Sequence, residues 1–284
     1  MHWRLRNRVL QFESRCLVMG IVNVTPDSFS DGGRFLPTDA AVAHGLELVR
    51  QGADLLDIGG ESTRPGSLPI SVAEELDRVV PVITALAQQT DVTISVDTSK
   101  AAVARACLEA GAHIINDVTG LTGDPDMPAT AHDLGAGVIV MHMQGTPATM
   151  QIAPTYRDVV TDLFDYFGER IRALHAHGIS SENITLDPGI GFGKTRDHNV
   201  ALLARLAEFL PLGRPLCLGV SRKGFLGKLL DRPVDERLAG SLAAAAFALA
   251  HDAVHILRVH DVAPTRDLAR VWEVLKVNQD LEPR

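Results

Sequence analysis

The sequence predicts an α/β fold in which eight strand–helix units close into a single-domain (β/α)8 barrel. Eight short apolar runs recur along the 284 residues, and helix-like segments separate them. Most of the runs end at or near a polar residue, and barrel enzymes carry their functional residues at the C-terminal ends of their strands. No Ser/Pro-rich linker and no shift in composition divides the chain. An open, doubly wound sheet is the alternative, and the polar residues at nearly every strand end favour the barrel over it.

The apolar runs lead, one after another, to residues with chemical functions. The first run, Leu17 to Val22, stops at Asn23 and is followed by a polar loop that contains Pro26 and Gly32-Gly33. Proline and paired glycines do not continue a strand, so this long loop is interpreted as functional. The later runs lead to Asp57, Asp97, Asn116 with Asp117, Met141, Asp187, Ser221 to Lys223, and Arg258 with His260.

Helix start signals stand between several of these runs. The pair Thr38-Asp39 is expected to cap the first helix, and the pair Thr98-Ser99 is expected to cap the third. Ser71 and Glu74 have the spacing of a capping box, which predicts a helix that starts beside them. The alternation of such helices with apolar strands is typical of a parallel sheet.

Composition and charge argue against several classes of function. The net charge of −8 argues against nucleic acid or a membrane surface as the partner. The longest apolar stretch, residues 242–250, is about half as long as a membrane-spanning helix. Residues 1–15 lack the apolar region of a secretory signal and are interpreted as an N-terminal extension before a barrel domain of residues 16–284. The three cysteines form no CxxC pair, which is typical of reduced thiols in a cytoplasmic protein.

The polar residues at the strand ends favour a ligand with two kinds of chemistry. Carboxylates and amides suit a flat, nitrogen-rich heterocycle such as an amino-pyrimidinone, whose adjacent N–H donors one carboxylate can accept together. The cations Lys223 and Arg258, with His260, suit a phosphate or diphosphate. Taken alone, each of these residues has a structural alternative, such as a buried Asp paired with a barrel Lys or Arg. Together at one rim they favour a binding site formed by Asn23, Asp57, Asp97, Asn116, Asp187, Lys223, Arg258 and His260.

The glycine-rich stretch 187–195, DPGIGFGKT, is not a nucleotide phosphate loop. That motif requires a glycine five residues before Gly193, where this chain has Pro188. The glycines are instead expected to let the backbone pass close to a ligand, with Phe192 as a lid or stacking surface.

Several stretches resemble the motifs of the dihydropteroate synthase family. GIVNVTPDSFSDGG and ADLLDIGGESTRPGS are similar to its two signature stretches, and SVDTSK, NDVTG, LDPGIGFGK, GVSRKGFLG and LRVHDV follow in the family order. The resemblance covers about Leu17 to Asp261. It implies a (β/α)8 barrel, usually a homodimer, that joins a dihydropterin diphosphate to para-aminobenzoate. The products would be dihydropteroate, for folate synthesis, and diphosphate.

The resemblance also implies the residues that contact the pterin and its diphosphate. The pterin pocket would have Met141 and Phe192 as apolar walls, and Asn23 would be the ligand of a Mg²⁺ ion that binds with the diphosphate. The polar pterin residues would be Asp97, Asn116, Asp187 and Lys223, and the diphosphate clamp would be Thr63, Arg258 and His260.

The para-aminobenzoate site would be formed by Ser221, Lys223 and Pro65, and completed by two loops that carry Arg64 and Phe29. The loop after Asn23 is expected to order when metal and diphosphate bind, so that the pterin substrate binds first. Two alternatives remain on the same barrel, namely a pterin-dependent methyltransferase and a non-catalytic pterin-binding paralogue. Intact loop motifs and a diphosphate clamp argue against both. The residues expected to act in catalysis are Asp187, Lys223, Arg258 and His260.

Overall fold

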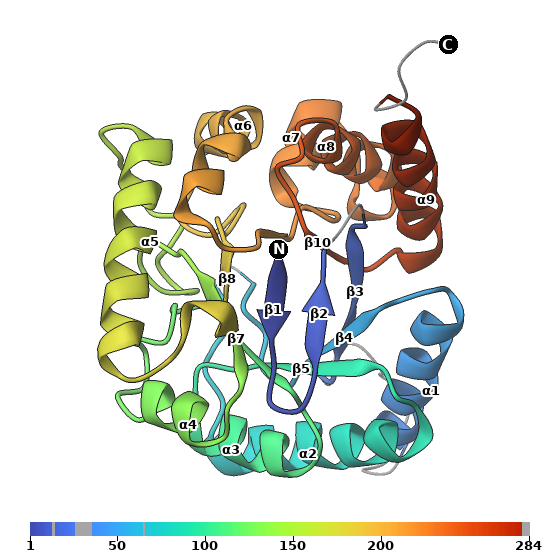
Figure 1. Ribbon diagram of the computed structural model, residues 1–284, viewed down its shortest axis with the longest axis vertical. Helices are drawn as coiled ribbons and strands as arrows, with labels where there is room; N and C mark the ends of the chain where they lie inside the picture. Colours follow the sequence, from blue (N-terminus) through green and yellow to red (C-terminus); the bar gives the residue numbers. More distant parts are fainter. Residues whose placement is uncertain (13–14, 26–35, 65, 280–284) are drawn as a thin grey trace.

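Eight parallel strands form one sheet with helices around it, which confirms the predicted barrel (Figure 1). The computed structural model describes residues 1–12, 15–25, 36–64 and 66–279. The sheet has the order β8-β7-β6-β5-β4-β3-β10-β9, and a parallel bridge between Leu186 and Leu216 joins its two edges. The strands are β3 (Leu17–Asn23), β4 (Leu55–Gly59), β5 (Thr93–Asp97), β6 (Ile114–Asp117), β7 (Gly137–Met141), β8 (Ile184–Asp187), β9 (Cys217–Leu218) and β10 (Ile256–Val259).

The helices surround the strands as a ring, which Figure 1 shows in projection. Short 3-10 segments, η2 (Ser181–Asn183), η3 (Leu206–Leu212) and η4 (Val234–Glu236), lie among them. The α-helices of the described residues are α1 (Leu36–Arg50), α2 (Val72–Gln89), α3 (Ala101–Glu109), α4 (Met127–Asp133), α5 (Val159–Ala176), α6 (Arg196–Ala204), α7 (Gly224–Leu230), α8 (Leu238–Ala250) and α9 (Val262–Gln279). Among these described helices, none is both long enough and apolar enough to cross a membrane.

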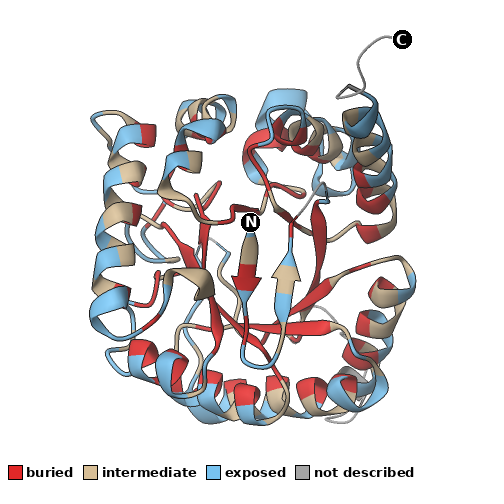
Figure 2. Cartoon of the chain, in the orientation of Figure 1, coloured by how far each residue is buried: buried red, intermediate tan, exposed pale blue. Residues whose placement is uncertain are grey.

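Each strand buries both of its faces, as expected for parallel strands covered by helices. In β3, Val18 and Val22 belong to the large apolar cluster between the strands and the helices. Leu17 and Met19, on the alternate face, belong to a smaller cluster in the barrel interior. Figure 2 shows the same division, with buried residues on the strands and on the helix faces turned toward them.

A β-hairpin covers the N-terminal end of the barrel. Its strands, β1 (His2–Arg4) and β2 (Val9–Gln11), pair antiparallel, and in Figure 1 they lie over the centre of the ring. Trp3 is completely buried and packs in the interior cluster with Leu17 and Ile139. Its indole Nε1 donates a hydrogen bond of 2.8 Å to the carbonyl of Asn183. The hairpin therefore closes the end of the barrel opposite the C-terminal strand ends.

The helix starts differ in part from the sequence predictions. The α1 helix begins at Leu36, so the pair Thr38-Asp39 lies in its first turn and does not cap it. The Ser71 hydroxyl does cap α2, since it accepts the Glu74 N–H at 3.2 Å, but the Glu74 carboxylate binds Arg78 at 2.5 Å.

The start of α3 is stabilised from another part of the chain. The carboxylate of Asp124 accepts the Ala101 N–H at 2.8 Å. The predicted cap at Thr98-Ser99 is therefore wrong, because the residue that precedes the helix is Lys100 and its side chain makes no capping hydrogen bond. A cap supplied across 23 residues has no local sequence signal.

Candidate active site

The C-terminal ends of the strands open into a cavity of about 940 Å³. Three predicted residues, Asn116, Met141 and Asp187, are at most 5% exposed and are not among the side chains that line it. Two others, Phe29 and Pro65, lie outside the described residues. The predicted residues that line the cavity are Asn23, Thr63, Arg64, Asp97, Phe192, Ser221, Lys223, Arg258 and His260.

Arg258 is the centre of a buried charge network. Its Nε donates to Asp57 at 2.6 Å and its Nη2 donates to Asp97 at 2.8 Å. The Asn116 amide donates to the same Asp57 oxygen at 3.0 Å. Asp57 is completely buried, so it supports the two residues from below the cavity. Sequence reasoning placed Asp57 among the ligand-facing groups, and the structure gives it this supporting position.

Burial also shifts the pKa of Asp97, whose carboxylate binds Arg258 and lines the cavity. It raises the pKa of Asp97 to about 7, although the positive charge of Arg258 acts to lower it. The nearby carboxylate of Asp57 raises the pKa of Asp97 further. Asp97 therefore changes its charge close to neutral pH.

Asp187 and Lys223 form the second charged group. Oδ1 of Asp187 accepts the Gly189 N–H at 2.7 Å, and a Cβ atom built on Gly219 would lie 3.9 Å from its Oδ2. Since Gly219 lines the cavity, Oδ2 lies beside the cavity wall. Burial raises the pKa of Asp187 and lowers that of Lys223 to about 8, and each residue's charge opposes the shift of the other. The ammonium of Lys223 lies 4.2 Å from the ring centre of Phe192, close enough for a cation–π contact.

Ser221 and His260 form a polar pair at the ends of β9 and β10. The Ser221 hydroxyl lies 3.1 Å from His260 Nδ1 and accepts the His260 backbone N–H at 3.3 Å. Burial lowers the pKa of His260 to about 4, and the positive charges of Arg258 and Arg222 lower it as well. The imidazole is therefore neutral near pH 7 in the ligand-free site, and it can serve a ligand as a hydrogen-bonding group.

Lys194 lies at the cavity and binds groups of the rim segments after β7 and β8. The sequence reasoning did not identify it. It is 2% exposed, and its ammonium contacts the Phe192 carbonyl at 2.9 Å and His142 Nδ1 at 3.0 Å. Burial lowers its pKa to about 7. The GFGK stretch was the available signal, but it served only to exclude a nucleotide site.

Two of the three glycines of this stretch are required by a neighbouring backbone. Gly189 and Gly193 both have φ near +64°. A Cβ on Gly189 would lie 2.0 Å from the His142 carbonyl oxygen, and one on Gly193 would lie 2.4 Å from the Gln144 carbonyl oxygen. The expectation that these two glycines make room for a ligand is therefore wrong, because the segment after β7 occupies that space.

The donor set for a metal is sparse. Asn23 lines the cavity at the C-terminal end of β3. Within the described ranges, no cluster of three or more His, Cys, Asp or Glu residues has the geometry to hold a metal ion. A metal at this rim would depend on neutral oxygens, water and ligand oxygens.

The family model for the pterin binding enzymes matches residues 19–260. Dihydropteroate synthase from Escherichia coli K12 is 52% identical over 256 residues, which cover 90% of each chain. The chain belongs to the dihydropteroate synthase family. As a member of it, the chain is a transferase of folate biosynthesis.

Solved dihydropteroate synthases have the same fold. The Yersinia pestis enzyme, in a complex with a sulfonamide drug, has a TM-score of 0.91 at 48% identity, covering 98% of this chain and all of that one. The Xanthomonas albilineans enzyme with 4-aminobenzoic acid has a TM-score of 0.90 at 47% identity, with 99% and 100% covered. The site described above therefore belongs to a dihydropteroate synthase barrel.

Proposed function

We propose that the chain condenses 6-hydroxymethyl-7,8-dihydropterin diphosphate with para-aminobenzoate to give 7,8-dihydropteroate and diphosphate. The observation that carries this is the cavity where Arg258, paired with the carboxylate of Asp97, lies beside the Ser221–His260 pair. Membership of the family supports the reaction, and the Xanthomonas albilineans enzyme has been solved in a complex with 7,8-dihydropteroate.

The pterin ring would bind where three amide and carboxylate side chains meet. Asp97 and Asp187 would accept hydrogen bonds from ring N–H groups. Asn116, which Asp57 holds in place, would hydrogen-bond the remaining edge of the ring. Met141 and Phe192 would supply the apolar walls, with Lys223 over the Phe192 ring. A carboxylate that holds a ring proton would stabilise positive charge that spreads into the pterin.

The diphosphate would leave toward Arg258, Thr63 and His260. Arginine has five N–H donors, and the contacts to Asp57 and Asp97 use two of them, so others are available for an anion. Arg258 would supply positive charge to the diphosphate, and His260 would supply a hydrogen bond. The carbon–oxygen bond to diphosphate breaks with its electron pair leaving on the diphosphate.

The arylamine would form the new bond from its own lone pair. Its nitrogen attacks the methylene carbon and then releases one proton to solvent, so a strong general base is unnecessary. Ser221, Lys223, Arg64 and the two residues outside the described ranges, Pro65 and Phe29, are the proposed para-aminobenzoate residues. The protein's task is to orient the amine and exclude water.

Mg²⁺ is the metal we propose for this site, with Asn23 as its protein ligand. Mg²⁺ commonly keeps several waters and takes one or two protein oxygens together with substrate phosphates. The few protein donors at this rim, within the described ranges, are compatible with that coordination. When bound, the ion supplies positive charge beside the diphosphate.

We also propose a cytoplasmic homodimer with no nucleic-acid or membrane partner. The three free, buried cysteines support the location. Exposed apolar residues on α8 and α9, including Phe247, Val271 and Val274, support a second copy as the partner. Light scattering after size exclusion measures the state, and a monomer at micromolar concentration would contradict the dimer.

Diphosphate release tests the proposed reaction directly. Purified protein is mixed with the pterin diphosphate, para-aminobenzoate and Mg²⁺, and diphosphate is measured together with dihydropteroate. Release that requires both substrates is the expected result. Pterin binding by calorimetry without any release would identify a non-catalytic paralogue instead.

A further inference from the structure

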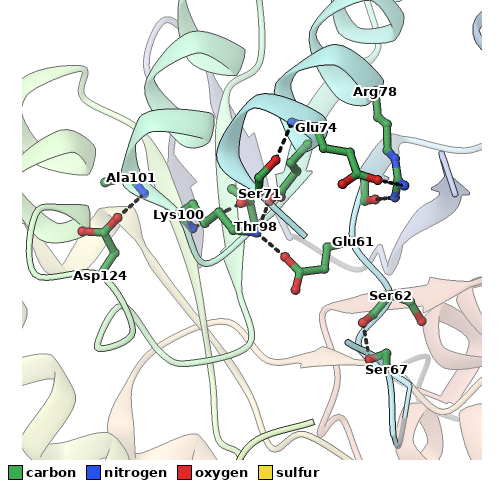
Figure 3. A network of polar contacts seen from close by, with 12 residues as sticks. Glu61, Ser62, Ser67, Ser71, Glu74, Arg78, Thr98, Lys100, Ala101 and Asp124 are labelled. Carbon is green, nitrogen blue, oxygen red and sulfur yellow. Dashed lines mark hydrogen bonds and ion pairs between the residues drawn. The ribbon is translucent and has the colours of Figure 1, made fainter. Parts of the chain in front are cut away.

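A lysine outside the cavity connects two neighbouring strand–helix units, β4–α2 and β5–α3. The ammonium of Lys100 binds the carboxylate of Glu61, which follows β4, and the carboxylate of Glu75 in α2 at 2.5 Å. Lys100 lies three residues after Asp97. Figure 3 shows Lys100 and Glu61 pointing toward one another from their two segments. We name Glu61, Lys100 and Glu75 the rim triad.

The rim triad is well shielded from water. The side chain of Glu75 is 1% exposed, and those of Lys100 and Glu61 are 20% and 22% exposed. Burial acts to lower the pKa of Lys100, yet the hydrogen bonds to Glu61 and Glu75 raise it. The lysine is therefore charged in any assay near neutral pH, and its charge holds both carboxylates.

Glu61 is the second residue of the loop that follows β4, and this loop carries Thr63 and Arg64 into the cavity. Just before it, the Gly60 carbonyl accepts a hydrogen bond of 2.7 Å from Arg78 of α2. Gly60 itself packs closely on α2, since a Cβ there would lie 2.7 Å from Val79. The beginning of the loop is thus fixed by α2 on one side and by Lys100 on the other.

The remainder of the described loop bonds mainly to itself. The Ser67 hydroxyl lies 2.5 Å from the carbonyl oxygen of Ser62 and 2.8 Å from that of Arg64, and its single proton is donated to one of the two. The Gly66 N–H donates to the carbonyl of Pro147 at 3.1 Å, which belongs to another rim segment. Because the loop closes on itself, the place where it is attached determines where Thr63 and Arg64 lie.

From this arrangement we infer that Lys100 is a positioning residue, which holds residues 61–64 through the rim triad so that Thr63 and Arg64 face the cavity. The inference rests on the proposed function, because the loop residues are assigned there to diphosphate and para-aminobenzoate. Lys100 does not line the cavity, but its partner Glu61 does, so Glu61 connects Lys100 to the cavity wall. The side-chain hydrogen bonds of the pterin residues Asn116 and Asp187 go to Asp57 and Gly189, outside the triad, whereas the charge of Glu75 helps to raise the pKa of the pterin residue Asp97.

Steady-state kinetics of four variants test the inference. Glu61→Met and Lys100→Met each remove the link, Lys100→Arg keeps the charge, and Arg50→Met breaks an exposed ion pair with Glu47 as the control. The expected result for the two link variants is a rise of about tenfold in KM for para-aminobenzoate, equivalent to about 1.4 kcal/mol. In Glu61→Met, which keeps the Lys100–Glu75 ion pair, the affinity for unphosphorylated pterin should stay within about twofold of wild type. Lys100→Arg should recover most of the loss, and Arg50→Met should match wild type.

The double variant Glu61→Met/Lys100→Met identifies the route. If Lys100 acts through Glu61, the double variant has the same KM as the worse single variant. Faster amide exchange at residues 61–64, with exchange in α3 unchanged, gives a second readout. Lys100→Met also leaves Glu75 as a buried, unpaired charge. If that variant does not fold, amide exchange at residues 61–64 in Glu61→Met decides, because Glu61 lines the cavity and its KM also reports direct contact with the substrate.

Three results would overturn the inference. An unchanged KM in both link variants would separate the triad from the loop. Equal losses in pterin affinity and in KM would make the triad a general structural support. Absence of diphosphate release from the wild-type enzyme would overturn the proposed function, and this inference with it.

Discussion

Replacing Asp187 by Asn tests the proposed pterin pocket at nearly constant volume. Oδ1 of Asp187 accepts the Gly189 N–H at 2.7 Å, while Oδ2 lies beside Gly219 at the cavity. The Asn side chain can keep its oxygen on Gly189. Its amide NH2 then takes the place of Oδ2 and presents a donor to the ring N–H of the ligand.

The magnitude follows from the loss of one charged hydrogen bond and the gain of one unpaired donor. A hydrogen bond to a charged group contributes about 1.5–3 kcal/mol, and a buried donor without an acceptor costs about 1–3 kcal/mol more. Asp187 is only 5% exposed, so water does not replace the lost partner. The expected loss of about 3 kcal/mol weakens pterin binding on the order of a hundredfold.

Isothermal titration with an unphosphorylated dihydropterin measures this loss. Asp165→Asn is the matched control, because Asp165 lies on α5 with 63% of its side chain exposed. The control should bind like the wild type, and both variants should keep the wild-type unfolding temperature within a few degrees. A Kd for Asp187→Asn within threefold of wild type would refute the assignment of Asp187 to the pterin.

Three further predictions use other parts of the molecule. Arg258→Met should weaken binding of the pterin diphosphate at least about tenfold more than binding of the unphosphorylated pterin, and equal losses in titrations would assign Arg258 to holding Asp57 and Asp97 alone. The pKa of Asp97 is raised from 3.8 to about 7 by burial, so its contribution to stability is present below about pH 4 and is lost as pH rises through 7. Urea unfolding of wild type against Asp97→Asn should therefore show the wild type losing relative stability between pH 5 and 8, and a constant difference would contradict this. Trp3→Ala should lower the free energy of unfolding by about 3–5 kcal/mol in urea with kcat unchanged, because Trp3 lies at the end of the barrel away from the cavity; a fall in kcat would link the two ends.

The strands and the polar residues at their ends were predictable because their signals are local. An apolar run that stops at Asp97 or Asp187 marks both a buried strand and the position where its last side chain emerges. In a parallel barrel all such ends lie at one rim, so the sequence order alone brings them together. The same logic explains why Asn23 and Thr63 line one cavity although they lie 40 positions apart.

The supporting residues were not predictable, because their partners are distant in the sequence. Asp57 and Arg258 are 201 positions apart, and nothing near either residue indicates the other. The same holds for Asp124 at the start of α3 and for Lys100 with Glu61. Lys194 shows a related failure, since a buried lysine that bonds to backbone carbonyls has the same local sequence as an exposed one.

Arg258 shows how these supports bear on ligand binding. A buried guanidinium without a partner would incur the full cost of leaving water. Without partners its side chain would also sample many rotamers. Asp57 fixes Nε from below at 2.6 Å and Asp97 fixes Nη2 from the side at 2.8 Å. The remaining N–H groups then have a set direction before any anion arrives, which is the condition for electrostatic preorganisation. The strand-end pattern thus identifies which residues can face a ligand, and the pairing below them determines how each one is oriented toward it.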